Sequence, residues 1–262
     1  MKPIGVFDSG VGGLTVAREL FRQLPGEDII YFGDIARVPY GIKSRETVIR
    51  FSIDNILFLL QQEVKLICVA CNTVSSVALP VIRNHFKVPL VGVITPAVRE
   101  AVYATKNKRI GVIGTHGTIK SHTYETEIQQ LDPEIRVFTQ ACPLFVPFVE
   151  EGWLKGSVVK EVAQTYLKPL KESRVDTLIL GCTHYPLIKP VLQEVMGKSV
   201  VLIDSATQVA IEVKKILGTD GELNKARRGK HKFYVSDNPE WFKELAGRFL
   251  GEKVKDVAKC TQ

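Results

Sequence analysis

The sequence predicts an α/β fold of two pseudo-symmetric domains with mainly parallel sheets and a binding cleft between them. Short β-rich runs alternate with helical patterns from the start of the chain, which is typical of parallel sheets covered by helices. Segments of the first half also return in the second half at offsets of about 106 to 112 residues. That period is too long for a solenoid and indicates a duplicated α/β unit.

The elements expected in the first half follow this alternation in order. They are a strand at residues 2–8, a helix at 14–24, a strand at 28–34, a helix from Ser44 to about Gln62 and a strand at 64–71. Apolar residues at three- and four-residue steps predict one buried stripe on the first helix. These residues are Leu14, Ala17, Leu20, Phe21 and Leu24. Pro80 interrupts the stretch after the third strand, and we expect a new helix to begin there.

The repeat predicts how the two halves face each other. The segment at 4–16 is echoed at 110–121, the segment at 66–73 at 178–186 and, more loosely, the segment at 88–96 at 199–207. Ligands of open parallel sheets bind beyond the carboxyl ends of the strands, so two such halves packed face to face would enclose one cleft. We expect the first domain to comprise residues 1–96 and 207–262 and the second to comprise 97–206. Hinges are expected near residues 96 and 206.

Length and composition indicate an ordinary globular protein. With 262 residues, 45% of them apolar, the chain can bury a substantial core. Its apolar runs fall far short of the roughly 20 residues that a bilayer span needs, and its N-terminus enters a strand pattern directly. Five cysteines are an odd number in a chain too long to need disulfide staples. We therefore expect a cytoplasmic protein with free thiols, without a signal peptide or membrane association.

The net charge of +7 raises the question of nucleic-acid binding. The densest basic run is KARRGKHK at residues 225–232. A short run between two helical patterns is more often a solvated loop, and no aromatic residues are interleaved with it to read bases. A nucleic-acid-binding module therefore stays the non-enzymatic alternative. The excess positive charge would equally attract an anionic metabolite.

Two cysteines occupy equivalent points of the repeat. Cys71 and Cys182 each end an apolar strand, and each is followed by a threonine within two residues. If the two halves face each other, the two sulfurs face each other across the cleft. Backbone N–H groups at a helix N-terminus lower the pKa of a thiol, so we expect a thiolate near neutral pH. Cys68 lies three residues earlier on the strand, points to the opposite face and is expected in the core.

Opposed thiols admit several interpretations. A metal site would require further Cys or His residues at ligand spacing. A thioredoxin-like redox site would require a C-x-x-C whose sulfurs can meet, but Cys68 and Cys71 lie in an extended strand and point to opposite faces. A Cys–His hydrolase would pair Cys182 with His184 but leaves Cys71 unexplained. A pair of acid/base groups uses both thiols: one removes a proton from carbon and the other returns one to the opposite face. Asp8, at the end of the first strand, and His184 are the candidates that assist the two thiols.

The glycine-rich segment DSGVGGLT follows the first strand. It lacks the Gly-Lys-Ser/Thr of a phosphate-binding loop, and Thr15 stands where the dinucleotide fingerprint requires its third glycine. We interpret its glycines as allowing the backbone to approach a small carboxylate at a helix N-terminus.

Taken together, the motifs resemble glutamate racemase, a cofactor-independent family that makes D-glutamate for bacterial peptidoglycan. The matching segments are FDSGVGGLTV, GDIARVPYG, VACNT, IGVIGT, CPLFVPFVEEG and LILGCTHYPL. They follow one another in order from residue 4 to about residue 206, and the tail FYVSDNPEWFKELAGRFLG resembles the C-terminal segment of the family.

The resemblance implies roles for individual residues. Cys71 and Cys182 would be the two acid/base residues, Asp8 and His184 would assist them and also contact substrate, and Glu150 would support them. Further matches to substrate-binding positions are Ser9, Tyr40, Gly41, Asn72, Thr73, Thr118 and Thr183, with Asp34 as an acidic residue behind them. The family usually has Thr or Ser after that aspartate, whereas Ile35 stands here. The lost hydroxyl would alter packing near Tyr40 or contacts to substrate.

The resemblance also implies a setting for the reaction. L- and D-glutamate would be the substrates, and neither pyridoxal phosphate nor a metal would be needed. Family members are often homodimers. Aspartate racemase, or another racemase of the same superfamily, is the enzymatic alternative.

Overall fold

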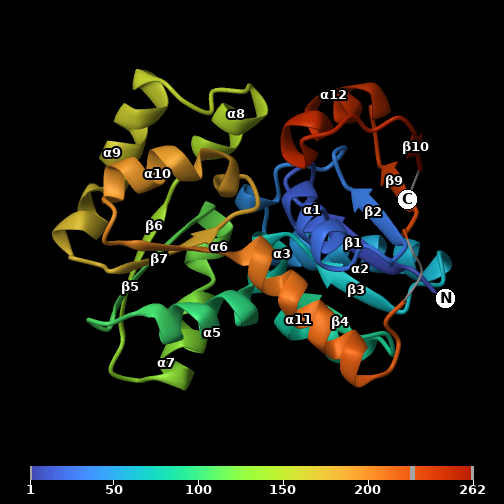
Figure 1. Ribbon diagram of the computed structural model, residues 1–262, viewed down its shortest axis with the longest axis horizontal. Helices are drawn as coiled ribbons and strands as arrows, with labels where there is room; N and C mark the ends of the chain where they lie inside the picture. The colour runs from blue at the N-terminus through green and yellow to red at the C-terminus, as the bar shows by residue number, and fades with distance from the viewer. Residues whose placement is uncertain (1, 225–227, 261–262) are drawn as a thin grey trace.

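The computed structural model describes residues 2–224 and 228–260, and it has an α/β fold with two parallel sheets lying side by side (Figure 1). The first sheet has the strand order β10 (Val257–Lys259), β9 (His231–Val235), β2 (Ile29–Gly33), β1 (Ile4–Asp8), β3 (Leu66–Val69) and β4 (Leu90–Gly92). The second has the order β6 (Arg136–Ala141), β5 (Arg109–Gly114), β7 (Thr177–Gly181) and β8 (Val201–Asp204). All described pairings are parallel, so the predicted fold class is confirmed.

The two sheets repeat one strand order. The sequence β2-β1-β3-β4 in the first sheet corresponds to β6-β5-β7-β8 in the second. The strands that the repeat paired therefore occupy equivalent places: β1 with β5, β3 with β7 and β4 with β8. The two C-terminal strands β9 and β10 extend the first sheet beyond β2.

The helices cover the sheets and fill the space between them. The helices of the first sheet's half are α1 (Leu14–Gln23), α2 (Arg45–Gln61), α3 (Asn72–Val77), α4 (Leu79–Ile82) and α12 (Pro239–Leu250), with short 3-10 turns η1 (Tyr40–Ile42) and η2 (Arg83–His85). The remaining helices are α5 (Ile94–Ala104), α6 (His116–Lys120), α7 (Thr123–Leu131), α8 (Phe145–Glu150), α9 (Ser157–Glu172), α10 (Lys189–Met196) and α11 (Ser205–Thr219), with the 3-10 turn η3 (Tyr185–Ile188). In Figure 1, α11 runs from the second sheet across to the first, and α8 and α12 lie near each other at the opposite side.

Local sequence explains several helix boundaries. Ser44 caps α2 by accepting a hydrogen bond from the Thr47 N–H at 3.3 Å. Asp204 caps α11 in the same way, with the Ala206 N–H at 2.9 Å. Pro80 lies in the first turn of α4, a short helix separate from α3, where its missing N–H removes no helical hydrogen bond.

The apolar pattern read from the sequence matches the core. On α1, Leu14, Ala17 and Leu20 are fully buried, while Phe21 packs at the edge of the core. Cys68 on β3 is also fully buried, as expected for a structural cysteine. Within the described residues, no helix combines the length and apolarity needed to cross a bilayer.

The proposed domain boundaries fall at two connecting helices. Residues 96 and 206 lie in the first turns of α5 and α11, which contact each other. α11 also packs against α1 of the first half. The division at these residues stays a prediction.

Candidate active site

A small cavity of about 50 Å³ lies where the carboxyl ends of the two sheets meet. The residues that line it are Ser9, Val38, Pro39, Tyr40, Gly41, Cys71, Asn72, Thr73, Thr115, Val146, Cys182, Thr183 and His184. Nine of the sequence-predicted site residues are among them. The other four predicted residues lie outside the lining: Asp8, Asp34, Thr118 and Glu150.

Parallel strands explain why these residues meet. Asp8 is the last residue of β1, and Cys71 follows β3 as the residue that precedes α3. Cys182 directly follows β7, and Thr115 follows β5. Because the strands within each sheet run in one direction, their ends gather at one edge, and the two edges face the same cavity. Cys71 and Cys182 are 5% and 6% exposed, so both thiols are shielded from bulk water.

Cys71 is held in an acidic and apolar setting. Its Sγ lies 3.5 Å from Ser9 Oγ. Burial, reinforced by the negative charge of Asp8, raises the pKa of the Cys71 thiol to about 12. The expectation of a lowered pKa is therefore wrong for Cys71. The N–H groups at the start of α3 do lower the value, but the helix has only six residues and their effect is smaller than the cost of desolvation.

Asp8 is buried beside Cys71. One carboxylate oxygen accepts a hydrogen bond from the Gly10 N–H at 3.0 Å, and the other makes no hydrogen bond to any described residue. Burial raises the pKa of this carboxyl group, although the charge of His184 and the N–H groups of the glycine loop oppose the shift. Asp8 is thereby suited to hold a proton near Cys71.

Cys182 has a different partner. Its Sγ lies 3.8 Å from His184 Nδ1, and His184 Nε2 lies 2.9 Å from a carboxylate oxygen of Glu150 at the end of α8. Burial alone would lower the pKa of His184, but Cys182 and Glu150 outweigh it and raise the pKa to about 10. A protonated imidazole at this position stabilises negative charge on the Cys182 sulfur.

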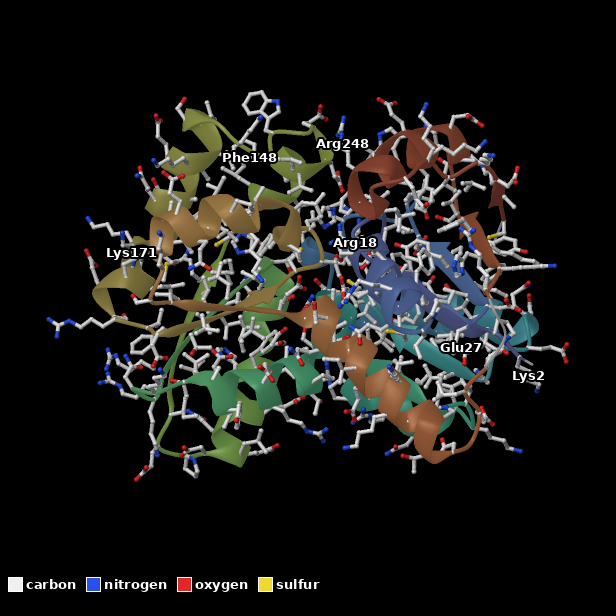
Figure 2. All side chains as sticks on the ribbon, viewed as in Figure 1. Lys2, Arg18, Glu27, Phe148, Lys171 and Arg248 are labelled. Carbon is white, nitrogen blue, oxygen red and sulfur yellow. The ribbon has the colours of Figure 1, made fainter. Side chains whose placement is uncertain are left out.

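The C-terminal helix α12 supports this histidine. Phe249 places its ring edge-on to the His184 ring, with centroids 5.4 Å apart. Arg248 donates a hydrogen bond to the backbone carbonyl of Glu150, and Figure 2 shows it between the two halves. Arg18 of α1 donates to the Phe249 carbonyl at 3.1 Å, which ties α12 to the first half. The histidine and its carboxylate are thus held by both halves of the molecule.

Polar side chains from both halves also meet beside the cavity. Thr73 Oγ1 lies 2.9 Å from Thr115 Oγ1 and 3.4 Å from Thr118 Oγ1. The amide oxygen of Asn72 accepts a hydrogen bond from the Tyr124 hydroxyl at 2.7 Å, while its nitrogen is buried and has no partner in the described part of the chain. Unpaired buried donors are rare, so this amide nitrogen is available for a ligand.

Two glycines allow the halves to approach closely. A Cβ atom at Gly12 would lie 2.3 Å from Thr183 Oγ1 and 2.5 Å from the His184 ring. A Cβ atom at Gly41 would lie 2.7 Å from Thr115 Cβ. Each glycine belongs to the first half and contacts the second, so side chains at these positions would force the halves apart.

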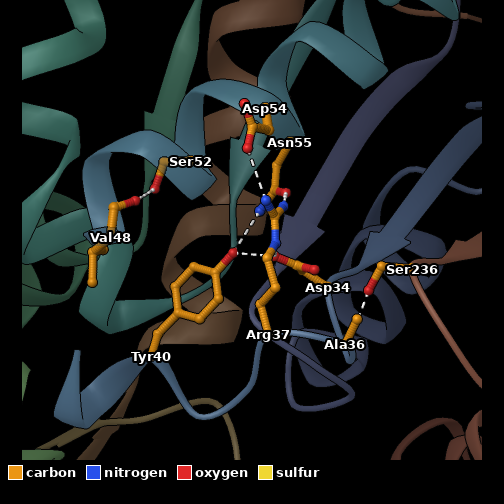
Figure 3. A network of polar contacts seen from close by, with 9 residues as sticks. All are labelled: Asp34, Ala36, Arg37, Tyr40, Val48, Ser52, Asp54, Asn55 and Ser236. Atoms are coloured by element: carbon orange, nitrogen blue, oxygen red, sulfur yellow. Dashed lines mark hydrogen bonds and ion pairs between the residues drawn. The ribbon is translucent and has the colours of Figure 1, made fainter. Parts of the chain in front are cut away.

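Asp34 lies behind the cavity in a network of polar groups (Figure 3). Its carboxylate accepts hydrogen bonds from the Tyr40 hydroxyl and from Arg37 Nε, the latter at 2.6 Å. Arg37 also contacts Asp54 at 2.8 Å and Asn55 at 2.9 Å. The network holds the Tyr40 ring against the cavity, and Asp34 itself is fully buried. Ile35 packs into the main hydrophobic core and does not line the cavity.

Sequence reasoning missed Thr115 and Tyr124. Thr115 stands in the GTHGT loop after β5. The resemblance assigns a substrate contact to Thr118 of this loop, whereas the structure places Thr115 on the cavity wall. Tyr124 lies on α7, and no local motif links it to Asn72, which precedes it by 52 residues. The apolar wall residues Val38, Pro39 and Val146 were also missed.

A larger groove of about 480 Å³ adjoins the cavity and shares Thr73 with it. Its wall carries the cations Lys43, Arg45 and Lys120, which we call the basic groove. The other wall residues are polar or apolar and uncharged. Its charge favours the approach of anions toward the cavity.

Other candidate sites in the sequence lie elsewhere. In residues 2–224 and 228–260, no three His, Cys, Asp or Glu residues are grouped so that they could hold a metal ion. Lys225, Ala226 and Arg227 of the basic run lie outside the described residues. The end of the run is built into the fold: the Lys230 N–H donates to Asp28 at 2.7 Å, and His231 stacks on Phe21 with ring centroids 3.8 Å apart.

Comparison with known proteins connects this chain to one family. The family model Asp/Glu/Hydantoin racemase matches residues 4–212. A glutamate racemase from Geobacter metallireducens is 52% identical over 258 residues, which is 98% of this chain and 95% of the relative.

Solved structures give the same relationship. A glutamate racemase from Francisella tularensis in complex with D-glutamate aligns with a TM-score of 0.94 and 40% identity, covering 99% of this chain and 97% of that one. A glutamate racemase from Bacillus anthracis aligns with a TM-score of 0.96 and 41% identity, covering 100% of this chain and 97% of that one.

Proposed function

The chain belongs to the Asp/Glu/hydantoin racemase family and, within it, to the glutamate racemases, and we propose that it interconverts L- and D-glutamate by proton transfer between two cysteines. The observation that carries the mechanism is that Cys71 and Cys182 line one small cavity from the ends of two different sheets. A carbon atom held between the two thiols is approached from two sides. Removing a proton on one side and adding one on the other inverts its configuration.

The two thiols differ in the way that such a reaction needs. The raised pKa of Cys71 keeps its thiol protonated, and the protonated His184, 3.8 Å from Cys182 Sγ, would stabilise negative charge on that sulfur. In one direction, the Cys182 thiolate takes the α-proton and Cys71 donates its proton to the opposite face of the carbanion. The products are a Cys182 thiol and a Cys71 thiolate, which is the state that the reverse direction requires. Asp8 and His184 are placed to exchange protons with the thiols between turnovers.

The transition state needs stabilisation because an α-proton beside a carboxylate is weakly acidic. Charge that develops on the carboxylate is stabilised by donors fixed in a dry site. The hydroxyls of Thr73 and Thr115 are such donors, while the amide nitrogen of Asn72 is placed to bind a substrate carboxylate. The unpartnered carboxylate oxygen of Asp8 is suited to an ammonium group.

The cavity volume implies that the halves move during turnover. Typical ligand sites measure about 300 to 1,000 Å³, whereas this cavity measures about 50 Å³. We propose that the halves separate to admit glutamate and close to exclude water. Glutamate carries two carboxylates and one ammonium group, so the basic groove beside the cavity would draw it toward the opening.

A second chemistry deserves a direct test because Cys182, His184 and Glu150 form a chain like that of a Cys–His hydrolase. That interpretation gives Cys71 no function. A hydrolase would release ammonia from glutamine, whereas a racemase would leave the amide intact.

The wider setting is proposed from the family resemblance. We propose a cytoplasmic enzyme that acts without pyridoxal phosphate, supplies D-glutamate for peptidoglycan and works as a homodimer. Light scattering tests the homodimer: a mass near twice the 29.2 kDa of one chain supports it, and a mass near 29.2 kDa rules it out.

Circular dichroism of L-glutamate without any added cofactor tests the function. We expect the optical signal to decay to zero as D-glutamate accumulates. Turnover of L-aspartate, measured in parallel, should be far slower, and faster turnover of aspartate would instead support the aspartate racemase alternative. A Cys71→Ser, Cys182→Ser double variant should neither racemise glutamate nor exchange its α-proton in deuterated water. Exchange by that variant would contradict the two-cysteine mechanism.

A further inference from the structure

We propose that Tyr124 is a positioning residue that orients the Asn72 amide toward a carboxylate of the substrate, an inference that rests on the proposed function. The hydroxyl of Tyr124 donates a 2.7 Å hydrogen bond to Asn72 Oδ1. Asn72 lines the cavity, and its Nδ2 is buried without a partner among the described residues. One end of the amide is therefore fixed by protein, and the other end is free beside the cavity.

The direction of this hydrogen bond decides whether the Asn72 side chain presents its donating nitrogen or its accepting oxygen to the cavity. An asparagine side chain has an accepting oxygen and a donating nitrogen that can exchange places by rotation. The Tyr124 hydroxyl donates to the amide oxygen, and burial raises the pKa of this hydroxyl above its ordinary value, so it stays protonated and able to donate. The amide oxygen is then held by Tyr124, and the two N–H bonds of Nδ2 are left to a group that accepts. A carboxylate is such a group, whereas a flipped amide would present its oxygen and repel it.

The position of the hydroxyl is itself fixed by the second half of the molecule. Tyr124 belongs to α7, and its ring is fully buried against the end of β7, where a Cβ atom at Gly181 would lie 3.3 Å from it. The residue after Gly181 is Cys182. The strand that carries one thiol thus supports the tyrosine that orients the substrate donor.

The contact also joins the two halves. Asn72 begins α3 in the first half, directly after Cys71, and Tyr124 lies in the first turn of α7 in the second. Beside it, Thr123 Oγ1 donates to the carbonyl of Ser76 at 2.9 Å. The start of α7 therefore forms two hydrogen bonds to α3. Asn72 is oriented for substrate when the halves are together, which couples carboxylate recognition to closure.

Steady-state kinetics of Tyr124→Phe test this inference. The variant removes the hydroxyl and keeps the ring. We expect KM for both enantiomers of glutamate to rise about fivefold, the size of effect that one hydrogen bond supports. We expect kcat to change by less than about twofold and the pH profile to keep its shape, because the lost contact acts on substrate binding and on neither thiol.

Tyr185→Phe is the matched control. Tyr185 is also fully buried in the second half, and its hydroxyl donates a 2.9 Å hydrogen bond to the Cys142 carbonyl, away from the cavity lining. Both variants lose one buried hydroxyl, so their melting temperatures should fall by similar amounts. Only Tyr124→Phe should raise KM.

A double-mutant cycle with Asn72→Ala separates positioning from general structural damage. If Tyr124 acts through Asn72, Tyr124→Phe should have little further effect on kcat/KM in the Asn72→Ala background. Additive losses would overturn the inference, as would an unchanged KM in an active Tyr124→Phe enzyme. A wild-type protein without racemase activity would overturn the proposed function and this inference with it.

The wild-type protein offers a readout that does not depend on the variants folding. The side-chain amide proton resonances of Asn72, identified by their loss in Asn72→Ala or by sequential assignment, should shift on addition of D-glutamate. Resonances that stay unmoved at saturating D-glutamate would contradict the contact.

Discussion

Replacing Glu150 by glutamine should move the alkaline limit of activity to lower pH. The change removes a carboxylate whose oxygen lies 2.9 Å from His184 Nε2 and keeps the size of the side chain. The pKa of His184 is raised from 6.5 to about 10 by Cys182 and Glu150 against the opposing effect of burial. The imidazole is therefore charged at neutral pH and loses its proton as the pH rises through about 10.

The size of the shift follows from the contact. A close opposite charge moves a pKa by roughly one to three units, and the upper part of that range is reduced here because the Glu150 side chain is 23% exposed to water. We expect the pKa of His184 to fall by about one to two units in Glu150→Gln. At pH 7 both enzymes keep the imidazole protonated and their kcat/KM values should be similar. At pH 9 the variant should be slower, by up to about tenfold in the direction that uses Cys182 as base.

The assay is kcat/KM for each enantiomer of glutamate from pH 6 to 10.5, with Glu151→Gln as the control. Glu151 is the exposed neighbour of Glu150 and carries the same charge. Its variant should follow the wild-type profile. Identical profiles for wild type and Glu150→Gln would refute the assigned part of Glu150, and an equal shift in both variants would show an effect of net charge alone.

The stabilisation of the fold by the Glu150–His184 pair should also be lost as the pH rises. A histidine whose folded-state pKa is raised stabilises the fold below its ordinary pKa and loses that contribution as the pH rises through the folded value. The stability difference between wild type and Glu150→Gln should therefore be fully present at and below about pH 6.5 and should vanish as the pH rises above about 10. Chemical denaturation at several pH values measures this difference.

Three further predictions concern closure, stability and substrate approach. Gly12→Ala should nearly abolish activity because its Cβ would collide with the His184 ring. Gly10→Ala is the control and should retain activity, because the nearest contact of its Cβ would be at 3.6 Å. Equal losses of activity in circular-dichroism assays of the two variants would contradict the steric argument. Arg37→Met should destabilise the protein by about 3 kcal/mol, because it leaves the buried carboxylate of Asp34 without its cation; a change below about 1 kcal/mol in urea denaturation would show that the network contributes little. Replacing the three cations of the basic groove by glutamine should lower kcat/KM and flatten its dependence on salt while leaving kcat unchanged, and a salt dependence equal to that of wild type would refute substrate steering.

Much of the fold could be read from local patterns. The alternation of strands and helices and the internal repeat predict two parallel sheets. The structure has two such sheets, and they share one strand order. The repeat also predicts the pairing of Cys71 with Cys182, because equivalent strand ends in a duplicated unit occupy equivalent places. Strand ends are short-range features, which is why the sequence locates them well.

What the sequence could not supply depends on contacts between distant segments. The direction of the Cys71 pKa shift is set by burial and by Asp8, which are properties of the packed protein, while the helix start that suggested the opposite direction is local. Thr115 and Thr118 share one loop, and only the position of that loop against Thr73 places Thr115 on the cavity wall. Tyr124 reaches Asn72 from another helix, so no spacing could have indicated it.

Deuterium incorporation by the single cysteine variants tests the central claim most directly. Each variant, Cys71→Ser or Cys182→Ser, keeps one thiol on one side of the substrate carbon. In deuterated water we expect each variant to exchange the α-proton of one enantiomer without inverting it, and the two variants to select opposite enantiomers. Exchange of the same enantiomer by both variants, or racemisation by either at a rate near that of wild type, would contradict two thiols acting on opposite faces.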